Sequence, residues 1–328
     1  MKETKNIIKA VMLGHAIGDA LGVPVEFESR DELDNNPITD MVGYGTYPVP
    51  AGTWSDDTSM SLAALDSLSK GAIDHFEIMV NFSKWLEDGK YTPTGECFDV
   101  GGTSLRAVQN FIGVCYSEKD GFVSPPHFDV TECGLNGEHC NGNGSLMRIH
   151  PFALMTCLDT RFRSNFEAII DQASALTHAH ERSKLACKIY AIILTNLIET
   201  PNKVVIPCAL EMAKYRYLDN PEYHHYVRLF EEGLGNLNRD EIKSTGYVVD
   251  TLEAAVWCLL TTDSYKECVL KAVNLGDDTD TVAAIAGGLA GALYGFDSIP
   301  QEWLDILIER EYIEEMCERA SAAWAPSK

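Results

Sequence analysis

The chain has 328 residues, is 45% hydrophobic and carries a formal net charge of -23 at pH 7. Its length and apolar content are enough for a sizeable core in one large domain or two ordinary ones. The acidic balance argues against non-specific nucleic-acid binding, which depends on Lys and Arg neutralising phosphates, so no nucleic-acid partner is expected. It does not exclude an anionic ligand, because bound cations and the N–H groups at helix N-termini also hold phosphates.

The ten cysteines are scattered and form no CxxC pair. Several lie in apolar runs, where cysteine behaves as a small buried hydrophobe. The first residues, Met1–Asn6, are charged and do not resemble a leader, and the longest apolar stretch, Val282–Gly295, is too short and too rich in glycine to span a bilayer. We therefore expect a reduced, cytoplasmic protein with no membrane partner. No heptad repeat is visible, and a monomer is expected.

The spacing of apolar residues predicts an almost wholly helical chain. Helices are expected to begin near Lys5, Asp56, Phe76, Thr103, Ser145, Phe166, Glu181, Val204, Pro221, Val249, Tyr265, Thr279 and Pro300, and the last of them covers Gln301–Ala322. The β-branched runs 204–206 and 247–249 are the strand candidates, and both continue into helical patterns. Three segments are apolar nearly all round and are expected at the centre of the fold: Leu185–Leu197, Ala254–Leu260 and Val282–Leu293. No shift in composition divides the chain, which favours one domain over residues 1–328.

Gly18 and Gly22 flank Asp19 near the end of the first predicted helix. Glycine lets a helix end and a chain turn tightly, so this segment is interpreted as a helix C-terminus with Asp19 as a buried, hydrogen-bonded carboxylate. The next segment, Phe27–Thr53, is long, irregular and rich in Pro and Gly. Such loops are often functional, and we expect a lid with Glu26 at its hinge; the alternative is a surface loop fixed by its prolines.

Two short acidic clusters are the most informative feature of the chain. Ser55-Asp56-Asp57-Thr58 precedes the apolar run that starts at Met60, and the segment 277–281, DDTDT, precedes the apolar run 282–285. Carboxylates crowded in this way repel one another, whereas Mg²⁺ and Mn²⁺ take oxygen ligands from carboxylates, hydroxyls and water. Two helix N-termini that face each other could hold a pair of such ions about 3.5–4 Å apart.

The simpler interpretation of either cluster is a helix N-cap, because Ser, Thr and Asp before an apolar run are typical of caps. A cap needs one such residue, and each cluster contains four or more. The same excess occurs twice, so a binuclear metal site is favoured over capping.

Three further segments place polar groups beside glycines or between helices. Asn141–Arg148 is a glycine-rich turn expected to run into a helix, and its N–H groups suit a diphosphate or ribose hydroxyls, although many helices simply begin this way. Asp99 precedes two glycines and is either a carboxylate of the site or the cap of the next helix. His178 and His180 join two apolar helices and are a possible zinc pair, but no thiolate neighbour supports it and a structural role is more common.

Taken together, these segments resemble the ADP-ribosylglycohydrolase family. The resemblance covers nearly the whole chain, in family order, through the blocks GHAIGDALGVPVEF (14–27), GTWSDDTSM (52–60), FDVGGT (98–103), GNGSLMR (142–148), TGYVVDTLEAA (245–255) and LGDDTDTVAAIAGGLAGALYG (275–295). Each block alone is of modest specificity, and the set is highly specific. The resemblance implies an all-α, single-domain orthogonal bundle of a dozen or more helices around a cleft that holds two Mg²⁺ or Mn²⁺ ions.

Carried over position by position, the resemblance assigns each site residue. The implied metal ligands are Ser55, Asp56, Asp57, Asp278, Asp280 and Thr281. The first is often Thr in the family, and Ser keeps the hydroxyl. The implied proton-transfer residues are Asp99 and the flap glutamate, Glu26. Contacts to ADP-ribose are expected from Asn143, Gly144, Ser145, His178, Gly246 and Tyr247.

The reaction implied by the resemblance is metal-dependent hydrolysis of the N-glycosidic bond of an ADP-ribosylated protein, with ADP-ribose as product. FDVGGT and TGYVVDTLEAA look closest to the bacterial arginine-directed branch, so arginine is the expected linkage. The alternatives are another linkage, to serine or to a small molecule, and a catalytically inactive relative that binds ADP-ribose or serves a structural role. The intact acidic clusters weigh against the inactive relative.

Overall fold

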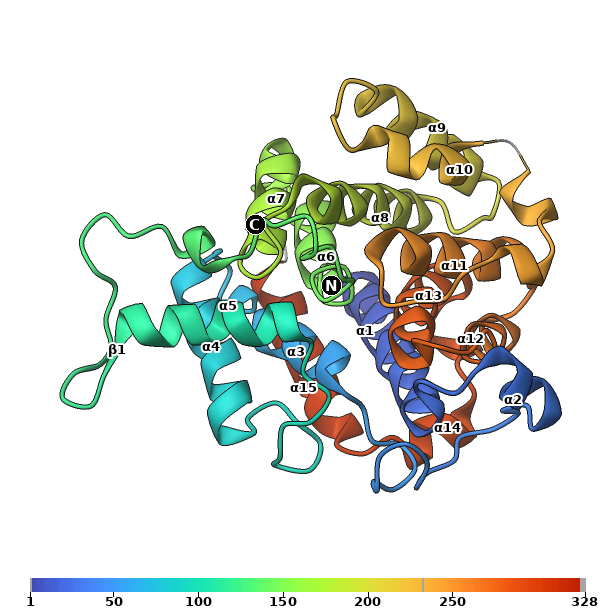
Figure 1. Ribbon diagram of the computed structural model, residues 1–328, viewed down its shortest axis with the longest axis horizontal. Coiled ribbons are helices and arrows are strands. Elements are labelled where there is room, and N and C mark those ends of the chain that lie inside the picture. Colours follow the sequence, from blue (N-terminus) through green and yellow to red (C-terminus); the bar gives the residue numbers. More distant parts are fainter. Residues whose placement is uncertain (1, 232, 325–328) are drawn as a thin grey trace.

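The computed structural model describes residues 2–231 and 233–324, and this part of the chain is almost entirely helical (Figure 1). Its fifteen α-helices are α1 (Lys2–Gly22), α2 (Arg30–Asn35), α3 (Asp56–Leu68), α4 (His75–Asp88), α5 (Gly102–Cys115), α6 (His150–Leu158), α7 (Phe166–Ala175), α8 (Glu181–Glu199), α9 (Val205–Arg216), α10 (Val227–Phe230), α11 (Val248–Leu260), α12 (Tyr265–Val273), α13 (Thr279–Tyr294), α14 (Gln301–Ile306) and α15 (Arg310–Ala323). Within the described ranges, β structure is limited to isolated bridges and one short antiparallel hairpin, β1 (Tyr116–Ser117) with β2 (Gly121–Phe122). The predicted all-α fold of a dozen or more helices is confirmed.

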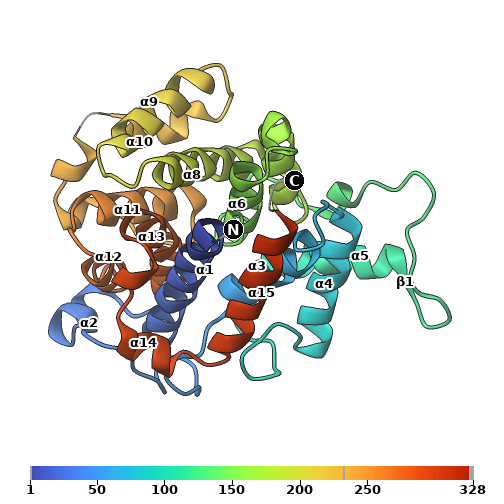
Figure 2. The ribbon, with the colours of Figure 1, turned by 180° about the vertical axis from the view of Figure 1, so that it is seen from behind.

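Helices α1 and α13 lie side by side at the centre of the molecule (Figures 1 and 2). Their backbones touch: a Cβ on Gly18 would lie 2.1 Å from the Ala283 carbonyl oxygen, and a Cβ on Gly22 would lie 2.2 Å from the Asp280 Cα. Glycine is the residue that permits this approach, since any side chain would collide with backbone. The antiparallel contact brings the C-terminal end of α1 against the first turn of α13, where the second acidic cluster lies.

The predicted helix C-terminus is found at Gly22, and this contact corrects only the role given to the two glycines. Helix α1 continues through Gly18 and ends at Gly22. Residues four apart share one face of a helix, so the two glycines face α13 together. Their spacing therefore reflects packing between helices, which the sequence pattern alone does not distinguish from a turn.

The three segments predicted to be central are buried. Leu185 in α8, Ala254 in α11 and Leu289 in α13 are all fully buried. Helix α1 belongs to the same core: the stretch Glu3–Val25 is long and apolar enough to cross a membrane by length and composition, but 94% of its most apolar window is buried inside the structure. Buried apolar residues from α1 to α15 form one contiguous cluster, while the single-domain organisation stays a prediction. Helices α9 and α10 lie at one edge and the hairpin at the opposite edge (Figures 1 and 2).

Several local predictions are wrong. The strand candidates 204–206 and 247–249 lie at the starts of α9 and α11, because the apolar spacing that follows them is helical. The helix expected near Ser145 begins at His150, after a turn. The single terminal helix over Gln301–Ala322 is two helices, α14 and α15, and Glu309 at the break has a φ of 52°, outside the helical region.

Candidate active site

Two helix N-termini meet beside the C-terminal end of α1. Ser55 immediately precedes α3, and Asp278 immediately precedes α13. The Thr281 hydroxyl donates to Asp57 Oδ2 at 3.2 Å, so the two acidic clusters are in direct contact. The positive ends of both helix dipoles face the carboxylates and stabilise their charge. The structure thus brings together the two clusters in which all the sequence-predicted metal ligands lie.

The Asp19 carboxylate contacts the first acidic cluster and fixes the first turn of α3. It accepts hydrogen bonds from the Ser55 N–H at 2.8 Å, the Thr58 N–H at 3.0 Å and the Thr58 hydroxyl at 2.6 Å. Asp19 is fully buried, as predicted for a hydrogen-bonded carboxylate. One oxygen each from Asp19, Asp57 and Asp280 lie within 4.8 Å of one another, so Asp19 also belongs to the acidic centre.

Asp280 belongs to two carboxylate triads, of which the first is the set of Asp19, Asp57 and Asp280 just described. Oxygens of Glu26, Asp99 and Asp280 also lie within 4.8 Å of one another. Glu26 follows the short 3₁₀ turn after α1, and Asp99 lies in the loop before α5 with a φ of 52°. Two triads that share one carboxylate have the donor set to hold neighbouring cations.

Several oxygens in these triads have no hydrogen-bond partner. Asp57 Oδ1, Asp280 Oδ2 and Glu26 Oε2 are buried and unpaired among the described residues. Burial first, and then the charges of neighbouring carboxylates, hold the pKa of Asp57 and of Asp280 well above the ordinary range. Burial, followed by the charges of Asp99 and Asp278, raises the pKa of Glu26 to about 9. A divalent cation satisfies such oxygens and removes the repulsion, so these residues fit a metal ion.

Capping accounts for only part of the acidic clusters. The Ser55 side chain does cap α3 by accepting from the Asp57 N–H at 3.4 Å. The side chain of Asp278 makes no capping hydrogen bond to α13. The alternative role of Asp99 as a cap is wrong, because the N-cap of α5 is Gly101. Capping by Ser55 therefore leaves the carboxylates of both clusters without an explanation.

A cavity of about 240 Å³ opens beside the carboxylates. Its lining residues are Glu26, Phe27, Asp56, Asp99, Gly101, Gly102, Thr103, Ser104, Gly142, Asn143, Gly144, Met147, His178, Gly246, Asp278 and Thr281. The lining combines four acidic side chains, called here the acidic wall, with glycine-rich turns from three parts of the chain, called here the glycine-rich wall. The size suits part of a ligand of nucleotide dimensions, with the remainder outside the cavity.

Asn143 connects the glycine-rich wall to the acidic wall. Its side-chain amide donates to Asp278 Oδ2 at 2.9 Å, and its N–H donates to the Gly246 carbonyl at 3.1 Å. A Cβ on Gly144 would lie 2.9 Å from His178 Cε1, so glycine is required for this close approach. Burial, and then the positive charge of Arg148, lower the pKa of His178 to about 3, so its imidazole is neutral and can accept or donate one hydrogen bond.

Two sequence-predicted substrate contacts do not line the cavity. Ser145 is fully buried, and its hydroxyl accepts from Ser174 at 2.9 Å in the core. Tyr247 lies behind Gly246 and pairs with Gly142 through an isolated antiparallel bridge. The structure therefore places Ser145 in the core, and Tyr247 is next to Gly246 in the chain without lining the cavity.

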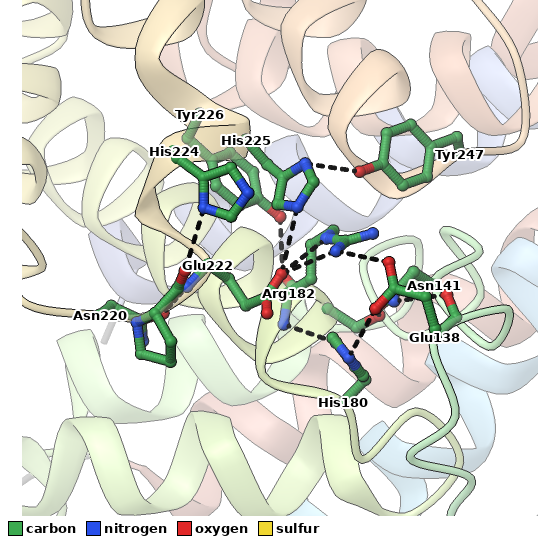
Figure 3. Close-up of polar contacts among 12 residues, drawn as sticks. Glu138, Asn141, His180, Arg182, Asn220, Glu222, His224, His225, Tyr226 and Tyr247 are labelled. Carbon is green, nitrogen blue, oxygen red and sulfur yellow. Dashed lines mark hydrogen bonds and ion pairs between the residues drawn. The ribbon is translucent and has the colours of Figure 1, made fainter.

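An ion-pair network surrounds Arg182 and reaches Tyr247, which directly follows Gly246 (Figure 3). The Arg182 guanidinium donates to Glu138 Oε1 and to Glu222 Oε2, each at 2.8 Å. It also lies 5.8 Å from the centroid of the Tyr247 ring. The Tyr247 hydroxyl is 3.4 Å from His225 Nδ1, and His225 Nε2 is 3.4 Å from Glu222, which closes a ring of contacts. Arg182 thus links the loops that contain Glu138 and Glu222 to Tyr247, which directly follows Gly246.

His180, the second histidine of the HxH pair, belongs to this network rather than to the cavity. Its Nδ1 accepts from the Arg182 N–H at 3.2 Å as the N-cap of α8, and its Nε2 is 3.4 Å from Glu138 (Figure 3). His178 Nδ1 instead contacts the Thr177 hydroxyl at 2.9 Å. The two imidazoles have separate partners, which favours the structural interpretation over a zinc pair.

Sequence reasoning missed Tyr47. Its ring lies 5.0 Å from the Phe98 ring, next to Asp99. Burial, and then the charges of Asp99 and Glu26, hold the pKa of the Tyr47 phenol above its ordinary range, so the hydroxyl stays protonated beside the two carboxyls. Tyr47 lies within an irregular loop without periodicity, and no spacing in the sequence signalled that it contacts the site.

The segment Phe27–Thr53, expected to be a lid, is anchored at several points. The Arg30 guanidinium donates to three backbone carbonyls, those of Leu275, Arg239 and Ile242, at 2.7–2.9 Å. Asn274 exchanges two hydrogen bonds with the backbone of Ile38, at 2.8 and 2.9 Å. These contacts favour the fixed-loop alternative for residues 28–41. The prediction of a lid is therefore kept only for the part that follows Met41.

The fold and the cavity define a helical protein whose two acidic helix N-termini converge on one site. A model of the ADP-ribosylglycohydrolase family matches residues 1–328, and the chain belongs to this family, whose members are hydrolases. The chain is 35% identical over 322 residues to the ADP-ribosylarginine hydrolase Tri1 of Serratia proteamaculans (strain 568), covering 97% of this chain and 79% of that one.

Two further comparisons agree with this assignment. The ADP-ribosyl-[dinitrogen reductase] glycohydrolase of Rhodospirillum rubrum is 32% identical over 305 residues, covering 91% of this chain and 90% of that one. The solved structure of an ADP-ribosylglycohydrolase-related protein complex superimposes with a TM-score of 0.79 at 26% identity, covering 98% of this chain and 99% of that one. The resemblance in sequence is thus confirmed at the level of family and fold.

Proposed function

We propose that the protein hydrolyses the N-glycosidic bond between ADP-ribose and arginine in ADP-ribosylated proteins, with two Mg²⁺ or Mn²⁺ ions as cofactors. The observation that carries the proposal is Asp280, which belongs to both carboxylate triads and has a buried, unpaired Oδ2. The names of the arginine-directed relatives support the linkage. The product would be ADP-ribose, and the partner an ADP-ribosylated protein. We also propose that the protein acts as a cytoplasmic monomer.

The residues that would hold the ions are those of the two helix N-termini. They are Ser55, Asp56, Asp57, Asp278, Asp280 and Thr281, and the adjacent Asp19 and Glu26 face the same centre. When bound in such a site, divalent ions polarise oxygen ligands and lower the pKa of a water molecule.

Glu26 and Asp99 are the proposed proton-transfer residues. Glu26 is the proposed acid: in its protonated form, its carboxyl group can donate a proton to the departing guanidine nitrogen. Asp99, within 4.8 Å of Glu26, can accept the proton of the attacking water. The C–N bond breaks as the C–O bond forms, through an oxocarbenium-like transition state. The neutral His178 and the N–H groups of the glycine-rich wall would orient the ADP-ribose.

The proposal is tested by incubating the purified protein with matched ADP-ribosyl-arginine and ADP-ribosyl-serine proteins, with and without EDTA, and following free ADP-ribose. We expect release from the arginine linkage that EDTA abolishes and that added Mg²⁺ or Mn²⁺ restores. A preference for the serine linkage in side-by-side kinetics would assign the protein to the other linkage. Metal and ADP-ribose binding without release from either substrate would instead favour the inactive relative.

The division of roles between Glu26 and Asp99 has its own test. A general acid matters less when the leaving group departs easily, so Glu26→Gln should lose less activity on an ADP-ribosyl compound with a leaving group of low pKa than on the arginine linkage. Asp99→Asn should lose activity on both. Equal losses of Glu26→Gln on the two substrates would contradict the role of Glu26 as the acid.

A further inference from the structure

Phe27 combines two features that are unusual for an aromatic residue. Its φ is 67°, in the left-handed region that bulky side chains rarely adopt. Its side chain is 68% exposed, and it lines the cavity beside Glu26. A single exposed apolar residue needs no explanation, but an exposed one held in a strained backbone conformation at a site does.

The strained conformation is imposed by paired hydrogen bonds to the second acidic segment. The Phe27 N–H donates to the Asp277 carbonyl at 2.7 Å, and the Asp277 N–H donates to the Glu28 carbonyl at 2.8 Å. Asp277 also has a left-handed φ, of 60°. These bonds fix the segment that carries Phe27 directly against the loop that leads to Asp278. The backbone that carries the Phe27 ring is therefore held in a fixed position at the edge of the cavity.

The turn itself does not require phenylalanine. Glycine, or Asn with its short polar side chain, adopts the left-handed conformation at lower cost. The same junction uses glycine at Gly276, where φ is 80° and a Cβ would lie 2.7 Å from the Arg30 backbone nitrogen. Phenylalanine at position 27 thus has a use other than making the turn.

The surroundings of Phe27 indicate what its ring could bind. The cavity lining combines glycine-rich turns, which offer backbone N–H groups, with the side chains of Glu26, Phe27 and Asp99. Backbone N–H groups suit the anionic part of a ligand. An aromatic ring beside carboxylates suits a planar cation, since guanidinium stacks on aromatic faces and pairs with carboxylates.

We propose that Phe27 is the residue that recognises the acceptor side of the substrate, by contacting the guanidinium group of the ADP-ribosylated arginine. This inference rests on the proposed function and extends it to the choice of linkage. A serine-linked substrate presents no cation at this position and gains nothing from the ring. Phe27 therefore favours the arginine linkage without contributing to the binding of ADP-ribose itself.

Phe27→Asn and Phe27→Leu test the proposal, and Tyr215→Leu is the control. Asn tolerates the left-handed conformation, so Phe27→Asn removes the ring without added strain. Tyr215 is also aromatic and 70% exposed, but it lies on α9 and does not line the cavity. For each variant we would measure kcat/KM on arginine-linked and serine-linked substrates and the Kd for free ADP-ribose.

We expect both Phe27 variants to lose about 10-fold in kcat/KM on the arginine linkage, the size of a partly desolvated cation–π contact. The Kd for ADP-ribose and any activity on the serine linkage should be unchanged. Phe27→Trp should retain the arginine activity, and Tyr215→Leu should match the wild type throughout. Equal losses on both linkages, a weaker Kd for ADP-ribose, or no loss at all would overturn the role of Phe27.

The same measurements separate this proposal from the proposed function. A wild-type protein that prefers the serine linkage, or releases no ADP-ribose from arginine, would overturn both. A wild-type protein that prefers arginine, with a preference that Phe27→Asn leaves intact, would overturn only the assignment of Phe27.

Discussion

The Asp19 carboxylate of α1 accepts hydrogen bonds from both the N–H and the hydroxyl of Thr58 in α3, at 3.0 and 2.6 Å. The same end of α1 packs backbone to backbone against the first turn of α13 at Gly22. One central helix therefore positions the N-termini of both helices that carry the acidic clusters. A site built on rigid helices in this way can hold its carboxylates in place despite their repulsion.

Asp19→Asn should weaken both stability and activity. The amide side chain of this variant would keep one acceptor oxygen, but its NH₂ group would face the N–H and hydroxyl donors that the Asp19 carboxylate now accepts from. At least one hydrogen bond to the carboxylate is therefore lost. We expect a decrease of about 1.5–3 kcal/mol in the free energy of unfolding, measured by urea denaturation. We also expect kcat to fall at least about 10-fold, because the first turn of α3 shifts.

The control for this change is Asp66→Asn on the same helix. Asp66 pairs with Arg319 at 2.8 Å and accepts from the Tyr91 hydroxyl at 2.7 Å, far along α3 from the acidic cluster. It should lose stability and keep kcat. Loss of kcat in both variants to the same extent would mean that general destabilisation, and not the position of α3, lowers the activity.

Asp280→Ala should remove activity and leave the fold intact, and Asp56→Ala should do the same. Asp280 is fully buried with an unpaired Oδ2, so its removal also relieves a desolvated, repelled carboxylate. In EDTA the Asp280→Ala protein should be at least as thermostable as the wild type. Added Mg²⁺ should raise its Tm less than it raises that of the wild type. Wild-type turnover by either variant at saturating Mg²⁺ would refute the shared metal site.

The stability of the protein in EDTA should fall as the pH rises. Burial raises the folded-state pKa to about 7 for Asp19 and to about 9 for Glu26, above the ordinary values of 3.8 and 4.5 expected for the unfolded chain. At a pH between its unfolded-state pKa and its folded-state pKa, each carboxyl group binds more protons in the folded state than in the unfolded state. The free energy of unfolding therefore decreases as the pH rises through this range. Tm measured from about pH 5 to pH 9 should decline in EDTA, and decline less in Mg²⁺, which replaces the protons. A Tm that rises with pH in EDTA would contradict the raised pKa values.

The residues of the acidic clusters could be predicted from sequence because the carboxylates of each cluster are neighbours in the chain. Asp56, Asp57, Asp278 and Asp280 form runs of charge that no structural element requires, and their excess over a cap is visible without coordinates. The helical nature of the core was predictable for the same reason, since α8, α11 and α13 are apolar over whole turns. Such signals depend on neighbours in sequence.

The rest of the site depends on contacts between distant segments. The roles of Gly18 and Gly22 are set by α13, more than 250 residues away, and a glycine in isolation looks the same in a turn and in a helix contact. Tyr47 reaches the site only because the loop folds back on Phe98. Ser145 was assigned from its motif, yet tertiary packing turns its hydroxyl into the core. No local pattern carries such information.

Arg182→Gln should raise KM with little change in kcat. Arg182 is 6% exposed and links Glu138, Glu222 and the Tyr247 ring next to the glycine-rich wall (Figure 3). Loss of the guanidinium leaves the wall less fixed, so ADP-ribose should bind roughly 10-fold more weakly while the carboxylates stay in place. Steady-state kinetics and calorimetry with ADP-ribose provide the measurements.

The matched control for Arg182 is Arg216→Gln on α9, which removes an ion pair with Glu167 in which both side chains are exposed, at 48% and 41%. It should leave both KM and kcat unchanged, since exposed pairs contribute about 0–1 kcal/mol. An unchanged KM in Arg182→Gln, or a fall in kcat alone, would show that the network does not position the wall.

Hydrogen exchange should slow in residues 42–49 when ADP-ribose and Mg²⁺ are added together. This part of the expected lid is mostly exposed, whereas residues 28–41 are held by Arg30 and Asn274. Within this part, the Tyr44 N–H donates to the Val49 carbonyl at 2.8 Å. Thr46 joins it to the segment before it: the N–H donates to the Pro24 carbonyl at 2.7 Å, and the hydroxyl donates to the Glu26 carbonyl at 2.6 Å. A ligand that contacts Glu26 and Tyr47 would therefore stabilise the closed position of this loop.

Residues 28–41 are the internal control and should exchange at the same rate with and without ligand. Unchanged exchange in residues 42–49, with full activity in Glu26→Ala, would leave the whole segment as scaffold.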